Sequence, residues 1–203
     1  MKLYITQPSP YARKCRIVAR ELGLAGGIQE VIADPYGDDP ALLAANPIVQ
    51  VPTLIAGDGR PVVDSTVICE HLNEIGGGGL LPASGPARLK VRRLETLANG
   101  ALEMGVKLLL EQRRPEGERS ASWTTRWTRN LNAALDRLEA EAIAGEPLDM
   151  GLVAIGSLLT WLDFRHPTWP GPRRGPTWLD SRAFWRPGQA SATRGLADAA
   201  RRG

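Results

Sequence analysis

Residues 50–66 constrain the fold of this chain more than any other stretch does. Two short apolar runs, at 53–56 and 61–63, flank the sequence Gly57-Asp58-Gly59. Asp-Gly between two apolar runs is a strong hairpin signal, because both central residues of such a turn prefer positive φ. Pro52 stands at the head of the first run, a position where a strand tolerates proline. We therefore expect a β-hairpin that leads into a helix beginning at Ser65.

The two ends of this hairpin carry polar groups that suit a short peptide ligand. A cis Val51-Pro52 bond would leave the backbone N–H and carbonyl of Val51 facing out from the sheet edge. Ser65 brings a hydroxyl and a backbone N–H to a helix N-terminus, whose partial positive charge favours a carboxylate. Val51 and Ser65 could therefore hold opposite ends of a peptide. The alternative is structural, with Pro52 as a turn proline and Ser65 as a helix N-cap.

The first third of the chain alternates strand and helix patterns. Strands are expected at 1–7 and 28–33, and helices at 10–22, 40–45 and 65–75. Ser9-Pro10 is a typical helix start, with serine at the N-cap and proline at the first helical position. Helical spacing predicts buried faces for the first and last of these helices at Cys15, Val18, Ala19 and Leu22, and at Ile68, Leu72 and Ile75. The order predicts a thioredoxin-like fold whose first two strands are parallel.

Gly76-Gly77-Gly78-Gly79 marks the clearest break in composition. No Lys-Ser or Lys-Thr follows these glycines, so a phosphate-binding loop is not expected. The later pattern is helical, with helices expected at 87–114, 123–142, 150–163, 177–184 and 190–200. Asp149 should cap the third of these, and Trp123 and Trp127 should lie in the core. The sequence thus predicts an α/β thioredoxin-like domain at 1–79, a linker at 80–86 and an all-α helical domain at 87–203.

The composition argues against several classes of function. Hydrophobic residues make up 43% and charged residues 23% of the chain, as in ordinary globular proteins. The net charge is +3, but the arginines are scattered over several expected helices, so no nucleic-acid partner is expected. The longest uncharged apolar run, 150–162, is too short to span a bilayer, and no signal-peptide pattern opens the chain. No membrane partner is expected either.

The cysteines and histidines do not suggest a metal site. Cys15 and Cys69 fall within apolar helical patterns without CxxC spacing, which predicts buried reduced thiols of a cytoplasmic protein. His71 and His166 have no further ligand at metal-binding spacing. We therefore expect no metal cofactor.

Several motifs, in order along nearly the whole chain, resemble those of bacterial glutathione S-transferases. They are Lys2-Leu3-Tyr4-Ile5, Ser9-Pro10-Tyr11-Ala12-Arg13-Lys14, Asn46-Pro47, Val51-Pro52 with its hairpin and Asp64-Ser65, Leu80-Leu81-Pro82, Leu97-Ala98-Asn99-Gly100 and Leu162-Asp163-Phe164-Arg165. The resemblance implies the two-domain architecture of that family. It also implies a cytoplasmic homodimeric enzyme that joins the sulfur of its co-substrate, glutathione, to a small apolar electrophile.

The resemblance assigns catalysis to Ser9. A thiol with a pKa near 8.5 is only a few per cent ionised at neutral pH, so the enzyme must stabilise the thiolate. A serine hydroxyl at a helix N-terminus can do so, because it can donate a hydrogen bond where the helix carries partial positive charge. The alternative is that Ser9 is only an N-cap. Tyr4 and Tyr11 are competing hydroxyls, and Cys15 is a competing thiol on an expected buried face.

The resemblance also assigns binding residues. Glutathione would contact Gln50, Val51, Pro52, Asp64, Ser65 and Asn99, and the apolar electrophile would contact Tyr11, Leu102, Val106 and Leu109, each of which could equally be a core residue. Gln50 stands where similar proteins often have lysine. Asn99 stands where many have an acid that reaches glutathione from the partner subunit, and Leu152 replaces the aspartate of a usual capping box. The neutral Gln50 and Asn99, together with the basic net charge, support an alternative, a non-catalytic glutathione-transferase-like binding or interaction protein.

Overall fold

The computed structural model describes residues 1–141 and 146–167 of the 203-residue chain. The chain forms two compact units. One comprises Met1–Arg92 with Leu148–Val153, and the other comprises the described residues of Arg93–Pro147 and those from Ala154 onward. The boundaries proposed from the sequence, with a linker at 80–86, stay a prediction.

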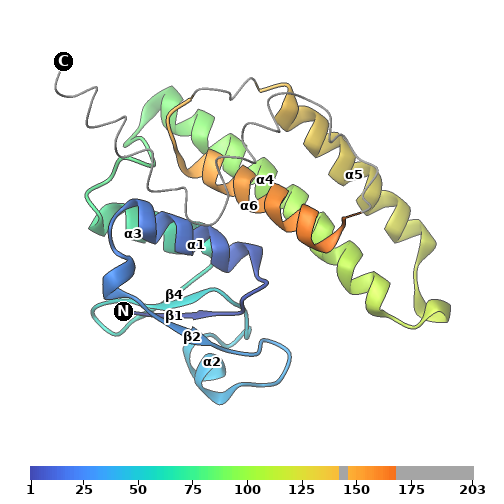
Figure 1. Cartoon of the computed structure of the whole chain (residues 1–203), viewed down its shortest axis with the longest axis horizontal. Coiled ribbons are helices and arrows are strands. Elements are labelled where there is room, and N and C mark those ends of the chain that lie inside the picture. The colour runs from blue at the N-terminus through green and yellow to red at the C-terminus, as the bar shows by residue number, and fades with distance from the viewer. Residues whose placement is uncertain (142–145, 168–203) are drawn as a thin grey trace. The chain divides into compact units, whose positions relative to one another are not determined.

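A four-stranded sheet with the order β2-β1-β3-β4 forms the base of the first unit (Figure 1). Strand β1 (Lys2–Ile5) is parallel to β2 (Gln29–Ile32) and antiparallel to β3 (Thr53–Ile55), which is antiparallel to β4 (Pro61–Val63). Gly59 in the β3–β4 turn has a φ of 84°, a value that glycine adopts without steric cost. The expected hairpin and the parallel first pair of strands are both confirmed.

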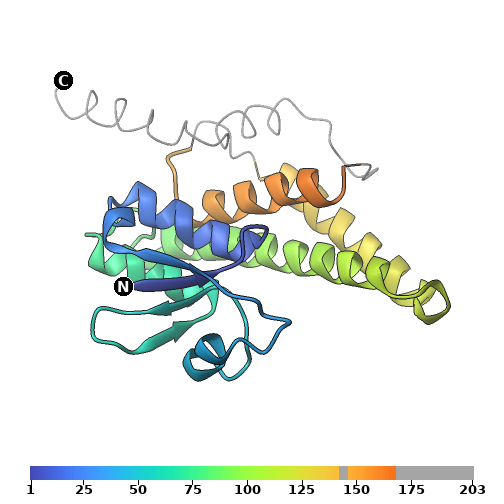
Figure 2. The same cartoon turned by 60° about the horizontal axis from the view of Figure 1, so that its bottom comes forward.

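Helices cover both faces of this sheet. Helices α1 (Pro10–Glu21) and α3 (Ser65–Ile75) lie side by side on one face, and α2 (Pro40–Ala45) lies on the other (Figures 1 and 2). A 3-10 turn, Ala25–Gly27, joins α1 to β2. The fully buried apolar side chains of α1, α3 and the sheet include Leu3, Ile5, Ala12, Cys15, Val18, Leu54, Ile68, Cys69 and Leu72. The arrangement is the thioredoxin-like fold expected from the order of elements.

The predicted inner face of α3 is wrong at its last residue. Ile75 is 48% exposed, whereas Ile68 and Leu72 are completely buried. Gly76 ends the helix directly after Ile75, and the last turn of α3 is buried at Leu72 and Asn73 but not at Ile75, its final residue.

The second unit is helical. Helix α4 (Gly85–Arg113) begins in the first unit and continues into the second, where α5 (Ala121–Glu139) and most of α6 (Met150–Arg165) also lie. A 3-10 turn, Glu116–Glu118, connects α4 to α5. As expected, Asp149 caps α6, because its Oδ1 accepts the Leu152 N–H at 2.8 Å. The helices expected at 177–184 and 190–200 lie outside the described residues. None of the helices described is long and apolar enough to cross a bilayer.

Helices α4 and α6 approach each other closely at Gly105. A Cβ atom at this position would lie 2.9 Å from the ring of Trp161, so any larger residue would force the Trp161 side chain or the helix backbones to shift. The carbonyl of Gly105 also lies 3.1 Å from Nε2 of His166. Burial lowers the pKa of His166, although the bond to Gly105 opposes this shift.

The predicted core position of Trp123 is wrong. Its side chain is 51% exposed and stacks on Trp127, with 5.6 Å between the ring centroids. The buried stripe of α5 passes through Leu131, Leu135 and Leu138. Trp123 lies eight residues before Leu131. At 3.6 residues per turn this separation places it about 80° around the helix from Leu131, at the edge of that stripe.

Candidate functional site

The register of the sheet brings three predicted site segments to one end of the sheet. Tyr4 of β1 pairs with Thr53 of β3, which pairs with Val63 of β4. Ser9 follows β1, the Val51-Pro52 segment precedes β3, and Asp64-Ser65 follow β4. Because β3 runs antiparallel to both neighbours, all three segments leave the sheet at the same end.

Ser9 is the N-cap of α1, as its sequence context predicts. Its Oγ accepts the N–H of Ala12 at 3.2 Å, and the side chain is only partly buried. A hydroxyl has one donor and two acceptor positions, so the capping bond leaves the O–H able to donate to a ligand. The capping role and the predicted catalytic role are therefore compatible in one residue.

The Val51-Pro52 peptide bond is cis. Pro52 is buried and Val51 is half-buried, while the side chain of Gln50 is exposed. Within the described part of the chain the backbone N–H of Val51 takes part in no hydrogen bond. A backbone donor is therefore present where the sequence predicts that a peptide binds.

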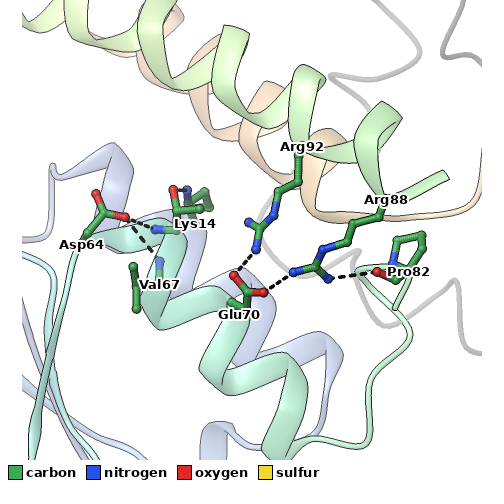
Figure 3. Close-up of polar contacts among 8 residues, drawn as sticks. Lys14, Asp64, Val67, Glu70, Pro82, Arg88 and Arg92 are labelled. Atoms are coloured by element: carbon green, nitrogen blue, oxygen red, sulfur yellow. Dashed lines mark hydrogen bonds and ion pairs between the residues drawn. The ribbon is translucent and has the colours of Figure 1, made fainter. Parts of the chain in front are cut away.

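Asp64, and not Ser65, is the N-cap of α3. Oδ1 of Asp64 accepts the N–H groups of Thr66 at 2.7 Å and of Val67 at 3.3 Å (Figure 3). The alternative prediction, in which Ser65 is the helix N-cap, is therefore wrong. Asp64 has a φ of 71°, a backbone conformation that costs a non-glycine residue about 1–3 kcal/mol and that is often found at functional sites.

This capping pattern leaves polar groups of Ser65 for a ligand. The hydroxyl and N–H of Ser65 have no hydrogen-bond partner among the described residues, and its carbonyl accepts the thiol of Cys15 at 3.6 Å. The residue is 5% exposed at the first turn of α3. An anion that reached this turn would meet a hydroxyl, an N–H and the positive end of the helix dipole.

Lys14 is a charged residue at this end of the sheet that sequence reasoning missed. It is 1% exposed, and its Nζ lies 3.3 Å from Oγ1 of Thr66 in the first turn of α3 (Figure 3). Lysine is rarely buried, so its position beside the helix N-terminus adds an unusual positive charge next to Ser65. The signal was the spacing of Pro10, Lys14 and Val18, which places Lys14 on the buried face of α1.

The two cysteines are buried and free, as predicted. Their Sγ atoms lie 3.7 Å apart between α1 and α3. Burial raises the pKa of Cys15, and the neighbouring Cys69 raises it further. A fully buried thiol with a raised pKa is a poor nucleophile, so Cys15 does not compete with Ser9 for a role in thiolate chemistry.

A charged cluster holds α3, which carries Ser65, to the start of α4 within the first unit. Glu70 of α3 binds both Arg88 and Arg92 of α4, and Arg88 also donates to the carbonyl of Pro82 at 3.0 Å (Figure 3). Burial alone would raise the pKa of Glu70, but the hydrogen bonds and positive charges of the two arginines outweigh it and lower the pKa.

The remaining predicted site residues are divided between the units. Tyr11 lies on α1 of the first unit and is half-buried, whereas Asn99, Leu102, Val106 and Leu109 lie on α4 in the second. Leu102 is 2% exposed, and the other three are half-buried. The apolar pocket and the role of Asn99 stay predictions. The described residues contain no group of three or more metal-ligating side chains.

Comparisons with known proteins agree with this architecture. A sequence profile of the glutathione S-transferase N-terminal domain matches residues 8–75. The uncharacterized GST-like protein YibF of Escherichia coli K12 is 30% identical over 176 residues, which cover 83% of this chain and 86% of YibF.

Two solved structures have the same fold. A glutathione transferase family member from Pseudomonas fluorescens Pf-5, solved with bound glutathione, has a TM-score of 0.86 at 28% identity, covering 94% of this chain and 97% of its own. A glutathione S-transferase from Methylobacterium radiotolerans, in complex with glutathione sulfonate, has a TM-score of 0.82 at 29% identity, covering 94% and 92%. From these matches and the geometry of the first unit, the chain belongs to the glutathione S-transferase family.

Proposed function

We propose that this protein binds glutathione at the end of the sheet where Ser9, Val51 and Ser65 meet, and that it transfers the glutathione thiolate to a small apolar electrophile. The observation that carries the proposal is the strand register, which brings a serine at a helix N-terminus to the same sheet end as the Val51 N–H and the polar groups of Ser65. The bound glutathione and glutathione sulfonate of the two similar structures support the choice of ligand.

Val51 and the start of α3 bind different parts of the peptide. The Val51 N–H is a donor for a backbone carbonyl of glutathione, and Ser65 receives a carboxylate at the helix N-terminus. Lys14 strengthens this second interaction, because a buried positive charge is poorly screened by solvent. The side chain of Gln50 contributes a neutral hydrogen bond to the glycine carboxylate.

Ser9 stabilises the thiolate of bound glutathione. Its O–H donates to the sulfur, while its Oγ continues to accept the N–H of Ala12. The hydrogen bond favours the thiolate over the thiol, so the bound thiol ionises below its solution pKa and releases its proton to solvent. The thiolate then attacks the electrophile and forms the carbon–sulfur bond, and the leaving group departs or, in an addition, the product takes up a proton from solvent.

The finer parts of the proposal follow the family resemblance. Tyr11, Leu102, Val106 and Leu109 form the apolar site for the electrophile. The protein acts as a cytoplasmic homodimer in which Asn99 reaches the glutathione amine from the partner subunit.

The proposal is tested by titrating the wild-type protein with glutathione and following thiolate absorbance against pH. We expect ionised glutathione at neutral pH and conjugation of a generic electrophile that persists as the pH falls toward about 6, well below an ordinary thiol pKa. Calorimetry run in parallel gives the dissociation constant. Binding without thiolate formation would remove the catalytic part, and no binding would remove the whole proposal.

A second candidate function is glutathione binding without catalysis. The neutral side chains of Gln50 and Asn99 favour it, because each replaces a charged group that similar proteins often have. The two candidates differ in the ionisation of the bound thiol at neutral pH, which the titration measures directly.

A further inference from the structure

A buried hydrogen-bond network surrounds the segment that precedes β3. Oδ1 of Asn46 accepts the N–H of Ile48 at 3.1 Å, and its Nδ2 donates to the Gln50 carbonyl at 3.2 Å and to Oγ1 of Thr53 at 3.0 Å. Oγ1 of Thr53 in turn donates to the Gln50 carbonyl at 2.8 Å. Asn46 is 1% exposed and Thr53 is completely buried. The network is closed, since each of its side chains both donates and accepts.

This network fixes the peptide unit between Gln50 and Val51. The Gln50 carbonyl accepts two hydrogen bonds from buried side chains, so its direction is set by Asn46 and Thr53. A trans peptide unit is planar, and its N–H points opposite to its C=O. The N–H of Val51 must therefore point away from the two buried side chains.

The backbone around the network is strained. Val49 has a φ of 50°, which is rare for a β-branched residue. Its N–H donates to the carbonyl of Asn46 at 2.9 Å. Strained backbone of this kind persists where surrounding contacts hold it in its conformation. Asn46 makes such contacts through both its main chain and its side chain.

We propose that Asn46 and Thr53 are positioning residues, which orient the Val51 N–H as a preformed donor for a peptide carbonyl of glutathione. This inference rests on the proposed function, in which Val51 binds glutathione. Neither side chain touches the ligand. They increase affinity because a donor held in its binding direction loses little conformational freedom when the ligand arrives.

The test compares glutathione affinity in wild type, Asn46→Ala, Thr53→Val and the double variant by calorimetry. Asn46→Ala should raise the dissociation constant about tenfold, the effect of a single well-placed hydrogen bond. The double variant should be little weaker than Asn46→Ala, since mutations within one network are not additive. Thr53→Ser keeps the hydroxyl and should bind as wild type does.

Asn73→Ala is the matched control. Asn73 is also a buried asparagine of the first unit, 7% exposed, and its Oδ1 also accepts a backbone N–H, that of Leu80 at 3.0 Å. Its loss should lower stability without changing glutathione affinity. Equal affinity of wild type, Asn46→Ala and Thr53→Val would overturn the positioning role. If Asn46→Ala does not fold, the affinities of Thr53→Val and Thr53→Ser are compared instead. Thr53→Val should fold, because valine suits a buried strand.

A nuclear magnetic resonance measurement separates this inference from the proposed function. In the ligand-free protein, Asn46→Ala should shift the amide resonances of Ile48 and Val51, and Asn73→Ala should leave both unchanged. Wild type that binds no glutathione would overturn the proposed function, and with it the ligand assigned to Val51. An unshifted Val51 amide in Asn46→Ala would overturn the positioning itself, whether or not glutathione binds.

Discussion

Ser9→Ala separates the two roles that the structure allows for this serine. The substitution removes the bond from the Ala12 N–H to Oγ, which is 3.2 Å long, and loss of an N-cap side chain costs about 1 kcal/mol of stability. It also removes the O–H that would donate to the thiolate. A hydrogen bond to a charged group contributes about 1.5–3 kcal/mol, which corresponds to about 1–2 pKa units. Because Ser9 is partly exposed, we expect an increase of about one unit in the pKa of bound glutathione.

The assay combines thiolate absorbance against pH with thermal unfolding in the presence of glutathione. Binding should survive in Ser9→Ala, because Val51 and Ser65 still hold the peptide. Glutathione at a hundred times its dissociation constant should then still stabilise the variant by about 2.7 kcal/mol. At pH 6 conjugation should fall further than at pH 8, since the raised pKa leaves less thiolate at the lower pH.

Ser120→Ala is the control for the loss of a cap. Ser120 is the N-cap of α5, and its Oγ accepts the N–H of Trp123 at 3.4 Å. This variant should lose a similar amount of stability and leave the pKa of bound glutathione unchanged. The catalytic assignment is refuted if Ser9→Ala also leaves that pKa unchanged, because Ser9 would then be an N-cap and nothing more.

Three further predictions concern binding and stability. Ser65→Ala should weaken glutathione binding by about 1.5–3 kcal/mol in calorimetry with little loss of stability. Asp64→Ala should also destabilise the fold by about 1 kcal/mol, because Asp64 caps α3. Unchanged affinity in both variants would contradict the assignment of Asp64 and Ser65 to glutathione binding. Gln50→Lys should tighten binding up to about tenfold, and a gain that did not shrink with added salt would mean that residue 50 faces elsewhere. Glu70→Gln should lower stability by up to about 1 kcal/mol at pH 7. The lowered pKa of Glu70 means that this contribution is complete above its ordinary value of 4.5 and is lost as pH falls through the folded-state pKa, so denaturant unfolding of wild type and variant should converge in acid.

Local sequence signals predicted most of the first unit. Gly57-Asp58-Gly59 marked the hairpin and Ser9-Pro10 marked the start of α1, because turns and caps depend on residues that are neighbours in sequence. Ile75 and Trp123 were wrongly placed for a different reason. Periodicity predicts which face of a helix is apolar, but it does not predict how far the neighbouring elements cover the end of that face, where Ile75 lies, or its edge, where Trp123 lies.

The polar residues of the site were harder to predict because their roles depend on contacts between distant segments. Lys14 meets Thr66 across the interface of α1 and α3, and a sequence pattern assigns lysine to solvent by default. Asn46 was noted only as part of the Asn46-Pro47 motif, since its bonds to Gln50 and Thr53 form when the chain turns back into β3. Capping by Asp64 depends on a positive φ that aspartate adopts more readily than most residues but that its identity alone does not require.

Lys14 and Gln50 differ in charge and in burial at the two ends of the proposed peptide site. Gln50 is exposed, so a lysine there would act through solvent and would be screened by salt. Lys14 is buried beside the first turn of α3, where the lower local dielectric makes its charge felt more strongly by an anion at Ser65. In the proposed binding mode the two residues face different carboxylates, because Lys14 lies beside Ser65 whereas Gln50 faces the glycine carboxylate. A neutral residue at position 50 should therefore weaken binding of the glycine carboxylate and leave the charge beside Ser65 unchanged, so Ser9 remains the residue on which enzyme and binding protein differ.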